Sequence, residues 1–108
     1  MMRGVSKLEV ARYVHECLAQ EEVPRVSELA SMHGLTPEYV SRSFRERFGV
    51  RISDYMKTIQ VRAAQRLLRT TDLNTTKIAY QCGFGTRRSF FRTYRRVAGA
   101  SPAEHGRR

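Results

Sequence analysis

Arginines recur on one side of a short segment near the end of the chain. Between residues 87 and 97, Arg88, Arg92 and Arg95 follow one another at intervals of three or four residues, and no acidic residue interrupts them. At about 100° per residue, this spacing puts them on the same face of a helix. A guanidinium donates two parallel hydrogen bonds to guanine O6 and N7 or to a phosphate. Like charges at this spacing destabilise a helix unless a polyanion compensates for them. We therefore predict that this face contacts nucleic acid. The alternative is a charged face that is simply solvated.

The opposite side of the same segment is apolar and aromatic. Phe90, Tyr94 and Val97 share this face, and Phe91 lies on its flank. Such a face is expected to anchor the helix in a protein core. This expectation disfavours the alternative of a basic amphipathic helix lying on a membrane surface.

A second segment, about 50 residues earlier, repeats this arrangement. Val40, Phe44 and Arg47 are predicted to share an inner face, with Phe48 near it. A polar outer side is predicted for Glu38, Arg42 and Arg45.

Each of these two helices follows a short apolar helix and a glycine turn. Ala30 precedes Gly34 by four residues, and Ala79 precedes Gly83 by four. A small residue lets two helices cross closely, and glycine supplies the positive φ of the turn between them. Two such matches in register predict two helix-turn-helix units. The matching positions are Leu29 with Ile78, Ala30 with Ala79, Gly34 with Gly83, Leu35 with Phe84, Val40 with Phe90, Arg42 with Arg92, Phe44 with Tyr94 and Gly49 with Gly99.

The periodicity is helical along the whole chain. Helices are predicted over about 7–20, 27–32, 36–47, 53–69, a short stretch around 78–82, and 87–97. We therefore predict an all-α fold in which residues 1–51 form an N-terminal helix-turn-helix subdomain, 52–71 a long linker helix and 72–108 a C-terminal helix-turn-helix subdomain. The first helix is predicted to bury Leu8, Ala11, Val14, Cys17 and Leu18, and the linker helix Ile52, Tyr55, Met56, Ile59, Ala63 and Leu67.

The positive charge of the chain belongs to its second half. The formal net charge is +10. Residues 1–50 hold seven lysines and arginines against seven acidic residues, whereas 51–108 hold thirteen against three. Such a field attracts polyanions and raises the rate of encounter with them. Nucleic acid is therefore the predicted partner, and solubility alone is the alternative.

Several classes of function are disfavoured by the remaining residues. Cys17 and Cys82 lie on apolar stripes and are predicted to be small buried thiols, which suit a reducing cytoplasm. No cysteine–histidine spacing indicates a zinc site, and no nucleophile–base pair is evident. We therefore predict a cytoplasmic protein that is not an enzyme and takes no metal or cofactor. No apolar run approaches the roughly 20 residues of a membrane span, and no signal-peptide core is present.

The chain resembles the DNA-binding domain of the AraC/XylS family of bacterial transcription regulators over about residues 8–105. The resemblance implies seven helices, a rigid linker helix, no enzymatic activity, and binding to double-stranded DNA at two successive major-groove segments. It also implies RNA polymerase as a partner, and two readers in one chain permit binding as a monomer. The residues that carry it are 27–30 (Ser-Glu-Leu-Ala), 34–44, Phe48-Gly49, Tyr55, Ala64, Leu67-Leu68, Ile78-Ala79, Cys82-Gly83-Phe84, 89–92 and 99–102.

The resemblance assigns roles to the outer residues of both helices. In the second unit, Arg95 and Arg96 lie further along the helix and are predicted to hold phosphates. The residues predicted to face bases or backbone are Glu38, Ser41, Arg42 and Arg45 in the first groove and Arg87, Arg88, Ser89 and Arg92 in the second.

Three positions depart from the family pattern. Gln60 replaces an arginine of the linker helix, so a phosphate or structural contact is expected to be missing there. Glu38 can accept a hydrogen bond from cytosine N4 but repels phosphates, so the first unit is expected to contribute selectivity more than affinity. After Pro102, the ending His105-Gly106 replaces the usual Tyr-Arg, which predicts a frayed last turn. A non-specific packaging or RNA-binding protein remains the alternative function.

Overall fold

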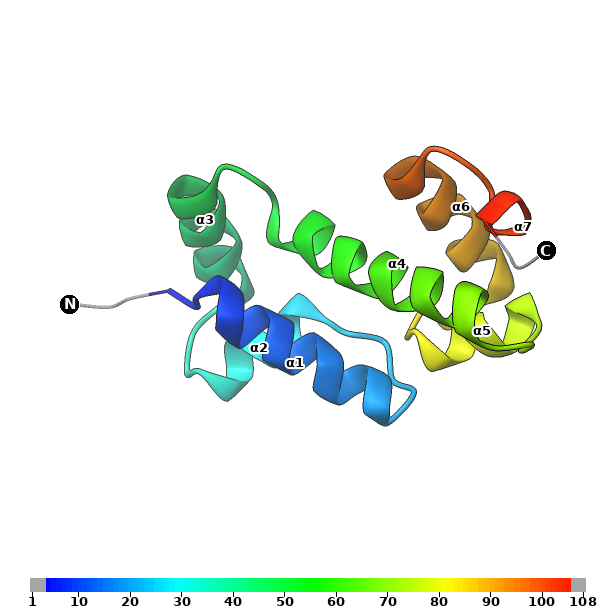
Figure 1. Cartoon of the computed structure of the whole chain (residues 1–108). Coiled ribbons are helices and arrows are strands. Elements are labelled where there is room, and N and C mark those ends of the chain that lie inside the picture. Colours follow the sequence, from blue (N-terminus) through cyan, green and yellow to red (C-terminus); the bar gives the residue numbers. More distant parts are fainter. Residues whose placement is uncertain (1–3, 106–108) are drawn as a thin grey trace.

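The computed structural model describes residues 4–105, and within them every regular element is a helix (Figure 1). The predicted all-α class is confirmed. The last helix is a single turn that begins at the buried Pro102, and residues 106–108 lie outside the described part. The helices are α1 (Lys7–Ala19), α2 (Val26–Met32), α3 (Pro37–Phe48), α4 (Ile52–Thr70), α5 (Thr75–Gln81), α6 (Arg87–Ala98) and α7 (Pro102–His105).

The two longer helices that follow the turns, α3 and α6, have the same kinds of N-cap and C-cap. The hydroxyl of Thr36 accepts a hydrogen bond from the backbone N–H of Tyr39, and Thr86 does the same at the start of α6. Each bond satisfies one of the N–H groups that a helix start leaves unpaired. Both helices end at a left-handed glycine, with φ of 77° at Gly49 and 82° at Gly99. The duplication seen in the sequence is therefore also a duplication of local structure.

The turns between paired helices repeat as well. Gly34 and Gly83 have φ of 69° and 73°, a backbone conformation that glycine adopts without strain. The residue after each glycine donates its N–H to the carbonyl of the buried alanine, at 2.9 Å in both units. Both Ala30 and Ala79 are fully buried. Their burial agrees with the expectation that a small residue at this position lets the two helices cross closely.

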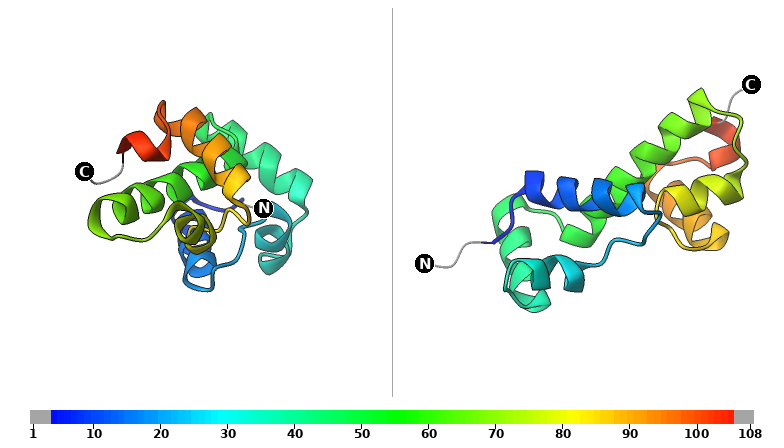
Figure 2. Two further views of the ribbon diagram at one scale, coloured as in Figure 1. Left: turned by 90° about the vertical axis from the view of Figure 1, so that its right-hand side faces the viewer. Right: turned by 90° about the horizontal axis from the view of Figure 1, so that it is seen from below.

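The helix α4 joins two separate hydrophobic cores. Ile52 and Met56 belong to the first core, with residues of α1, α2 and α3. Val61, Ala64 and Leu68 belong to the second core, with residues of α5 and α6. In the views of Figures 1 and 2, α4 runs lengthwise through an elongated molecule of 52 × 26 × 21 Å.

Predictions of burial are wrong for Leu8, Val97 and Arg47, and the prediction for α4 is correct only in part. Leu8 is 68% exposed, because the buried stripe of α1 runs through Val10 and Val14 and Leu8 lies about 200° from Val10. Val97 is 36% exposed at the last turn of α6, and Arg47 is exposed near the end of α3. In α4 only Ile52 and Met56 of the predicted stripe are among the most buried residues, because neighbours cover this helix from more than one side. The most buried residues of α4 are Ile52, Met56, Gln60, Val61, Ala64 and Leu68, while Tyr55, Ile59, Ala63 and Leu67 are half-buried.

Gln60 makes the structural contact that was expected to be missing. Its side chain is 6% exposed, and its amide nitrogen donates to the carbonyl oxygens of Cys82 and Gly83, each at 3.0 Å. A glutamine amide carries two N–H groups, so both of them are used here. The expectation was wrong because the sequence does not reveal which carbonyls the fold brings to this position.

Candidate nucleic-acid interface

The helices α3 and α6 run in similar directions. Both rise from the lower part of Figure 1 toward the top, and both slant the same way in the left view of Figure 2. The two repeated helices are therefore similarly oriented within the molecule.

The arginines in the middle of α6 extend into solvent. Arg88, Arg92 and Arg95 are exposed, while Phe90 and Tyr94 on the opposite side are fully buried. The two buried rings meet edge to face, with centroids 5.7 Å apart. A rigid aromatic anchor thus holds a row of guanidinium groups outward, as the spacing predicted.

The remaining predicted residues of the second unit have partners within the protein. The guanidinium of Arg87 lies over the ring of Phe91, 4.5 Å from its centroid, and its Nε donates to Thr75 at 3.2 Å. Arg96 forms an ion pair with Asp54. The side chain of Ser89 is half-buried. Arg87 and Arg96 both remain exposed to solvent despite these contacts.

The predicted residues of the first unit line one groove. Glu38, Ser41, Arg42 and Arg45 are all exposed on α3. They border an open groove of about 430 Å³ between α3 and the start of α4. The guanidinium of Arg42 also lies over the ring of Tyr39 at 6.0 Å. The structure therefore brings these four residues together on a concave surface.

Sequence reasoning missed two polar residues of this groove. Arg51 and Ser53 lie at the start of α4 and line the groove together with the apolar residues Val26 and Ile52. Arg51 is the N-cap of α4 and is exposed. The signal that could have found them is their place directly after the Gly49 turn, which returns the chain to the outer face of α3.

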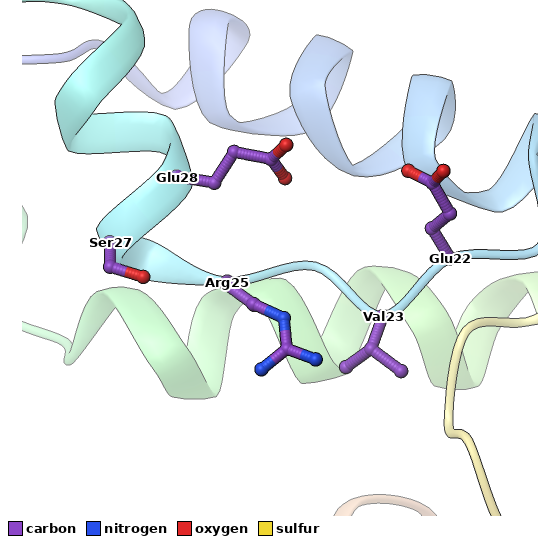
Figure 3. Close-up of a pocket in the computed structure, with 5 residues that line it drawn as sticks. All are labelled: Glu22, Val23, Arg25, Ser27 and Glu28. Carbon is purple, nitrogen blue, oxygen red and sulfur yellow. The ribbon is translucent and has the colours of Figure 1, made fainter.

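Another hollow lies on the connection between α1 and α2 (Figure 3). It is open, about 460 Å³ in volume, and lined by two glutamates, one arginine, one serine and one valine. The carboxylate of Glu28 accepts a hydrogen bond from the hydroxyl of Tyr13, and the backbone N–H of Arg25 donates to the same hydroxyl. The polar groups of this hollow therefore serve the packing of α1 against α2.

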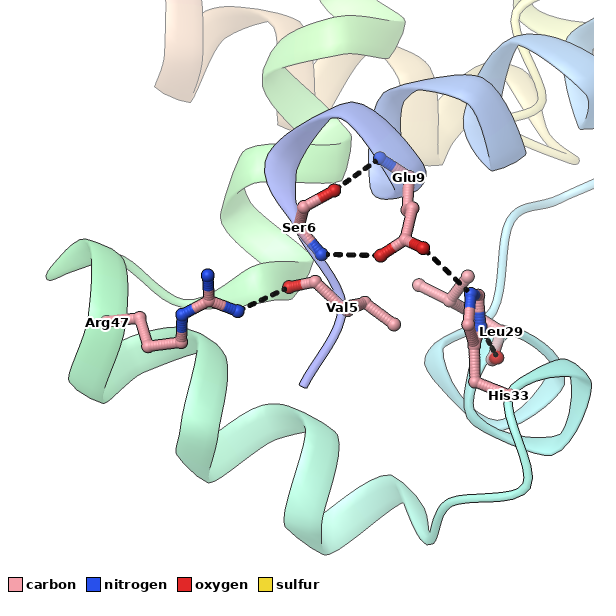
Figure 4. A network of polar contacts seen from close by, with 6 residues as sticks. All are labelled: Val5, Ser6, Glu9, Leu29, His33 and Arg47. Atoms are coloured by element: carbon pink, nitrogen blue, oxygen red, sulfur yellow. Dashed lines mark hydrogen bonds and ion pairs between the residues drawn. The ribbon is translucent and has the colours of Figure 1, made fainter. Parts of the chain in front are cut away.

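A second polar network ties the start of α1 to the first helix-turn-helix unit (Figure 4). Ser6 and Glu9 form a reciprocal capping box at 2.8 and 3.1 Å. The other carboxylate oxygen of Glu9 lies 3.7 Å from Nε2 of His33, and Nδ1 of His33 lies 3.1 Å from the carbonyl oxygen of Leu29. Arg47 donates to the carbonyl of Val5 at 3.5 Å, which is the limit of a hydrogen bond. This network holds α1 in place.

Both thiols are free and buried, as predicted. Burial raises the pKa of the Cys82 thiol to about 12 and also raises the pKa of Cys17. Among residues 4–105, no three histidine, cysteine or acidic side chains are grouped so that they could hold a metal ion. None of the described helices combines the length and apolar character that crossing a bilayer requires.

These features define a protein with two helix-turn-helix units and outward-facing basic residues. A family profile described as a helix-turn-helix domain matches residues 29–108. The chain therefore belongs to the AraC-type helix-turn-helix family of DNA-binding transcription regulators.

Curated relatives from bacteria match the chain over much of its length. The chain is 30% identical to the transcriptional regulator CdhR of Pseudomonas aeruginosa, covering 94% of this chain and 30% of the relative. It is 32% identical to GlxA of Rhizobium meliloti, covering 74% of this chain and 25% of the relative. The chain spans less than a third of the length of the curated relatives it matches.

Solved structures share the fold. The DNA-binding domain of AdpA, in complex with a target DNA, has a TM-score of 0.75 and 31% identity, with 90% of this chain and 88% of that one covered. The C-terminal domain of the response regulator yesN from Fusobacterium nucleatum has a TM-score of 0.82 and 25% identity, with 94% and 97% covered.

Proposed function

We propose that this chain reads double-stranded DNA sequence-specifically by placing α3 and α6 in successive segments of the major groove. The observation that carries the proposal is the similar direction of these two helices. A major groove is wide enough to admit one α-helix, and successive segments on one DNA face lie about 34 Å apart. The elongated shape of 52 Å provides this reach.

In the second unit, the base-reading residues are Arg88 and Arg92. Their side chains are exposed and held outward by the buried aromatic face of α6. Exposed guanidinium groups are the commonest readers of guanine. Ser89 and Arg87 contact the backbone at the start of the helix, and Arg95 binds a phosphate further along it.

In the first unit, the groove between α3 and α4 follows the DNA backbone. Arg42 and Ser41 face base edges, and Arg45 and Arg51 border the same groove with positive charge. Glu38 stands at the first turn of α3 and accepts a hydrogen bond from cytosine N4. Its negative charge weakens the hold on phosphate, so this unit contributes more to selectivity than to affinity.

The DNA complex of AdpA supports double-stranded DNA as the partner, because that domain shares the fold and 31% of its residues with this chain. One chain carries both readers, so it binds as a monomer. In keeping with a transcription regulator, the further expectations are contact with RNA polymerase, a cytoplasmic location and no enzymatic activity. The boundaries 1–51, 52–71 and 72–108 remain a prediction, to which the two cores lend support.

Selection of bound duplexes from a random pool tests the proposal. We expect enrichment of two short motifs about 10 base pairs apart, centre to centre, which is one turn of the double helix. Arg42→Ala should relax the preference at one base pair of one motif, and Arg92→Ala should do the same in the other motif. Binding with no enriched sequence would instead favour the alternative of a non-specific packaging protein, and preference for RNA over duplex DNA would favour an RNA-binding one.

A further inference from the structure

The turn of the second helix-turn-helix unit is held from two sides. On one side, Gln60 of α4 donates both hydrogen bonds of its amide to the carbonyl oxygens of Cys82 and Gly83. On the other side lies the connection between α1 and α2, which runs beside this turn in Figures 1 and 2. This arrangement links the second unit both to the linker helix and to the first unit.

The contact with the α1–α2 connection is very close. A Cβ atom added to Gly83 would lie 2.7 Å from the carbonyl oxygen of Glu22 and 2.8 Å from Cδ2 of Leu18. Such an atom on Gly85 would lie 3.3 Å from Cγ2 of Val23. The backbone of the turn is therefore packed directly on the first unit, with no room for a side chain between them.

The corresponding turn of the first unit is free of such contacts. Gly34 has nearly the same φ as Gly83, yet a Cβ added there would meet nothing within 4 Å. The close packing at Gly83 is therefore not a requirement of the helix-turn-helix turn itself. It belongs to the junction between the two units.

We propose that Gln60 is a positioning residue that fixes the relative orientation of α3 and α6, and with it the spacing between the two DNA segments that the protein accepts. Its two hydrogen bonds hold the turn at Cys82 and Gly83 against the α1–α2 connection. The turn leads directly into α6, so a shift of the turn moves α6 relative to α3. The consequence for DNA rests on the proposed function, whereas the orientation of the helices can be measured without DNA.

The test compares Gln60→Leu with two other variants. Leucine has a similar size but donates no hydrogen bond. Gln60→Arg restores a donor at the same position. Val61→Ala is the matched control for lost stability, because Val61 is buried in the same core but its side chain makes no hydrogen bond to the turn.

The first measurement is the distance distribution between spin labels on α3 and α6 in the absence of DNA. The labels replace the exposed residues Glu46 and Arg95, after alanine has replaced both buried cysteines. We expect one narrow distribution for the parent protein and Val61→Ala, a broader one for Gln60→Leu, and recovery of the narrow one with Gln60→Arg. A distribution that Gln60→Leu leaves unchanged, or that Val61→Ala broadens equally, overturns the proposal.

The second measurement is affinity for duplexes in which the spacing of the selected motifs is lengthened or shortened by one base pair. We expect the parent protein to lose about tenfold in affinity at the wrong spacing, the scale of one mismatched base pair, and Gln60→Leu to lose about threefold or less. Equal discrimination by both proteins overturns the role of Gln60 in spacing. If the parent protein selects only one motif, the proposed function fails, and the label distances still decide the role of Gln60 in orientation.

Discussion

Asp54 in the first turn of α4 lies 3.6 Å from Arg96 in the last turn of α6, measured from carboxylate oxygen to guanidinium nitrogen. The two side chains are 51% and 53% exposed, so the pair stands in solvent at the edge of the proposed DNA-binding surface. An exposed pair of this kind contributes at most about 1 kcal/mol. A phosphate can therefore compete with Asp54 for the donors of Arg96.

Asp54→Asn is expected to raise affinity for every DNA sequence by a similar factor. The change removes a negative charge beside the DNA and releases Arg96 to bind a phosphate. Titrations of specific and non-specific duplexes measure the effect, which should shrink as salt screens the charges. The gain should be smaller in the Arg96→Ala background, where only the removal of the negative charge still acts, and a gain of equal size there would show that release of Arg96 contributes nothing.

Arg92→Ala and Arg96→Ala are expected to weaken DNA binding in different ways. Loss of Arg92, in the middle of the outer face of α6, should cost about 1–3 kcal/mol of binding and relax the preference at one base pair. Loss of Arg96 should weaken all sequences alike and reduce the salt slope by about one. Footprinting titrations at several salt concentrations distinguish these outcomes. If Arg92→Ala kept both its affinity for DNA and its sequence preference, Arg92 would not be a base-contacting residue.

Gly83→Ala is expected to destabilise the protein more than Gly34→Ala. Both substitutions put a Cβ on a backbone with positive φ, which costs roughly 1–2 kcal/mol. Only the one at Gly83 also forces a contact of 2.7 Å with backbone, at Glu22. Denaturant unfolding of both variants measures the difference. Equal losses would mean that the α1–α2 connection moves aside at little cost.

The stability of the fold is expected to fall above pH 9 because of Cys82. Its pKa is about 12 in the folded protein, against an ordinary value of 9.0. The folded state therefore keeps a proton that the unfolded chain releases, and stability is lost as pH rises from about 9 toward 12. The loss by pH 10 should be about 1 kcal/mol. Unfolding at pH 8 and pH 10 should show a smaller pH effect for Cys82→Ala, and an identical pH effect would contradict this assignment.

Features that are local in the sequence were predicted well. The positions of Ala30 and Gly34, with their counterparts Ala79 and Gly83, gave both helix-turn-helix units, because steric size and a positive φ act within a few residues. The buried aromatic face of Phe90 and Tyr94 follows from an equally local rule, the helical periodicity of the apolar residues.

Features that depend on packing between distant elements were not predictable in the same way. The exposure of Leu8 follows from how α1 is rotated about its axis, which is decided by the partners that cover it. The hydrogen bonds of Gln60 to Cys82 and Gly83 span sequence separations of 22 and 23 residues. Arg51 joins the groove of α3 only because the chain turns back after Gly49. Helical periodicity carries no information about any of these relationships.

The uneven distribution of charge has a consequence for the order of events on DNA. Long-range electrostatic attraction to DNA acts mainly on the second half of the chain. We therefore expect α6 to contact the DNA before α3 does. While α6 stays on the backbone, α3, with Glu38 in its first turn, can lift away and sample new base pairs. Sliding along the duplex would thus be carried by one unit and interrogation of the sequence by the other.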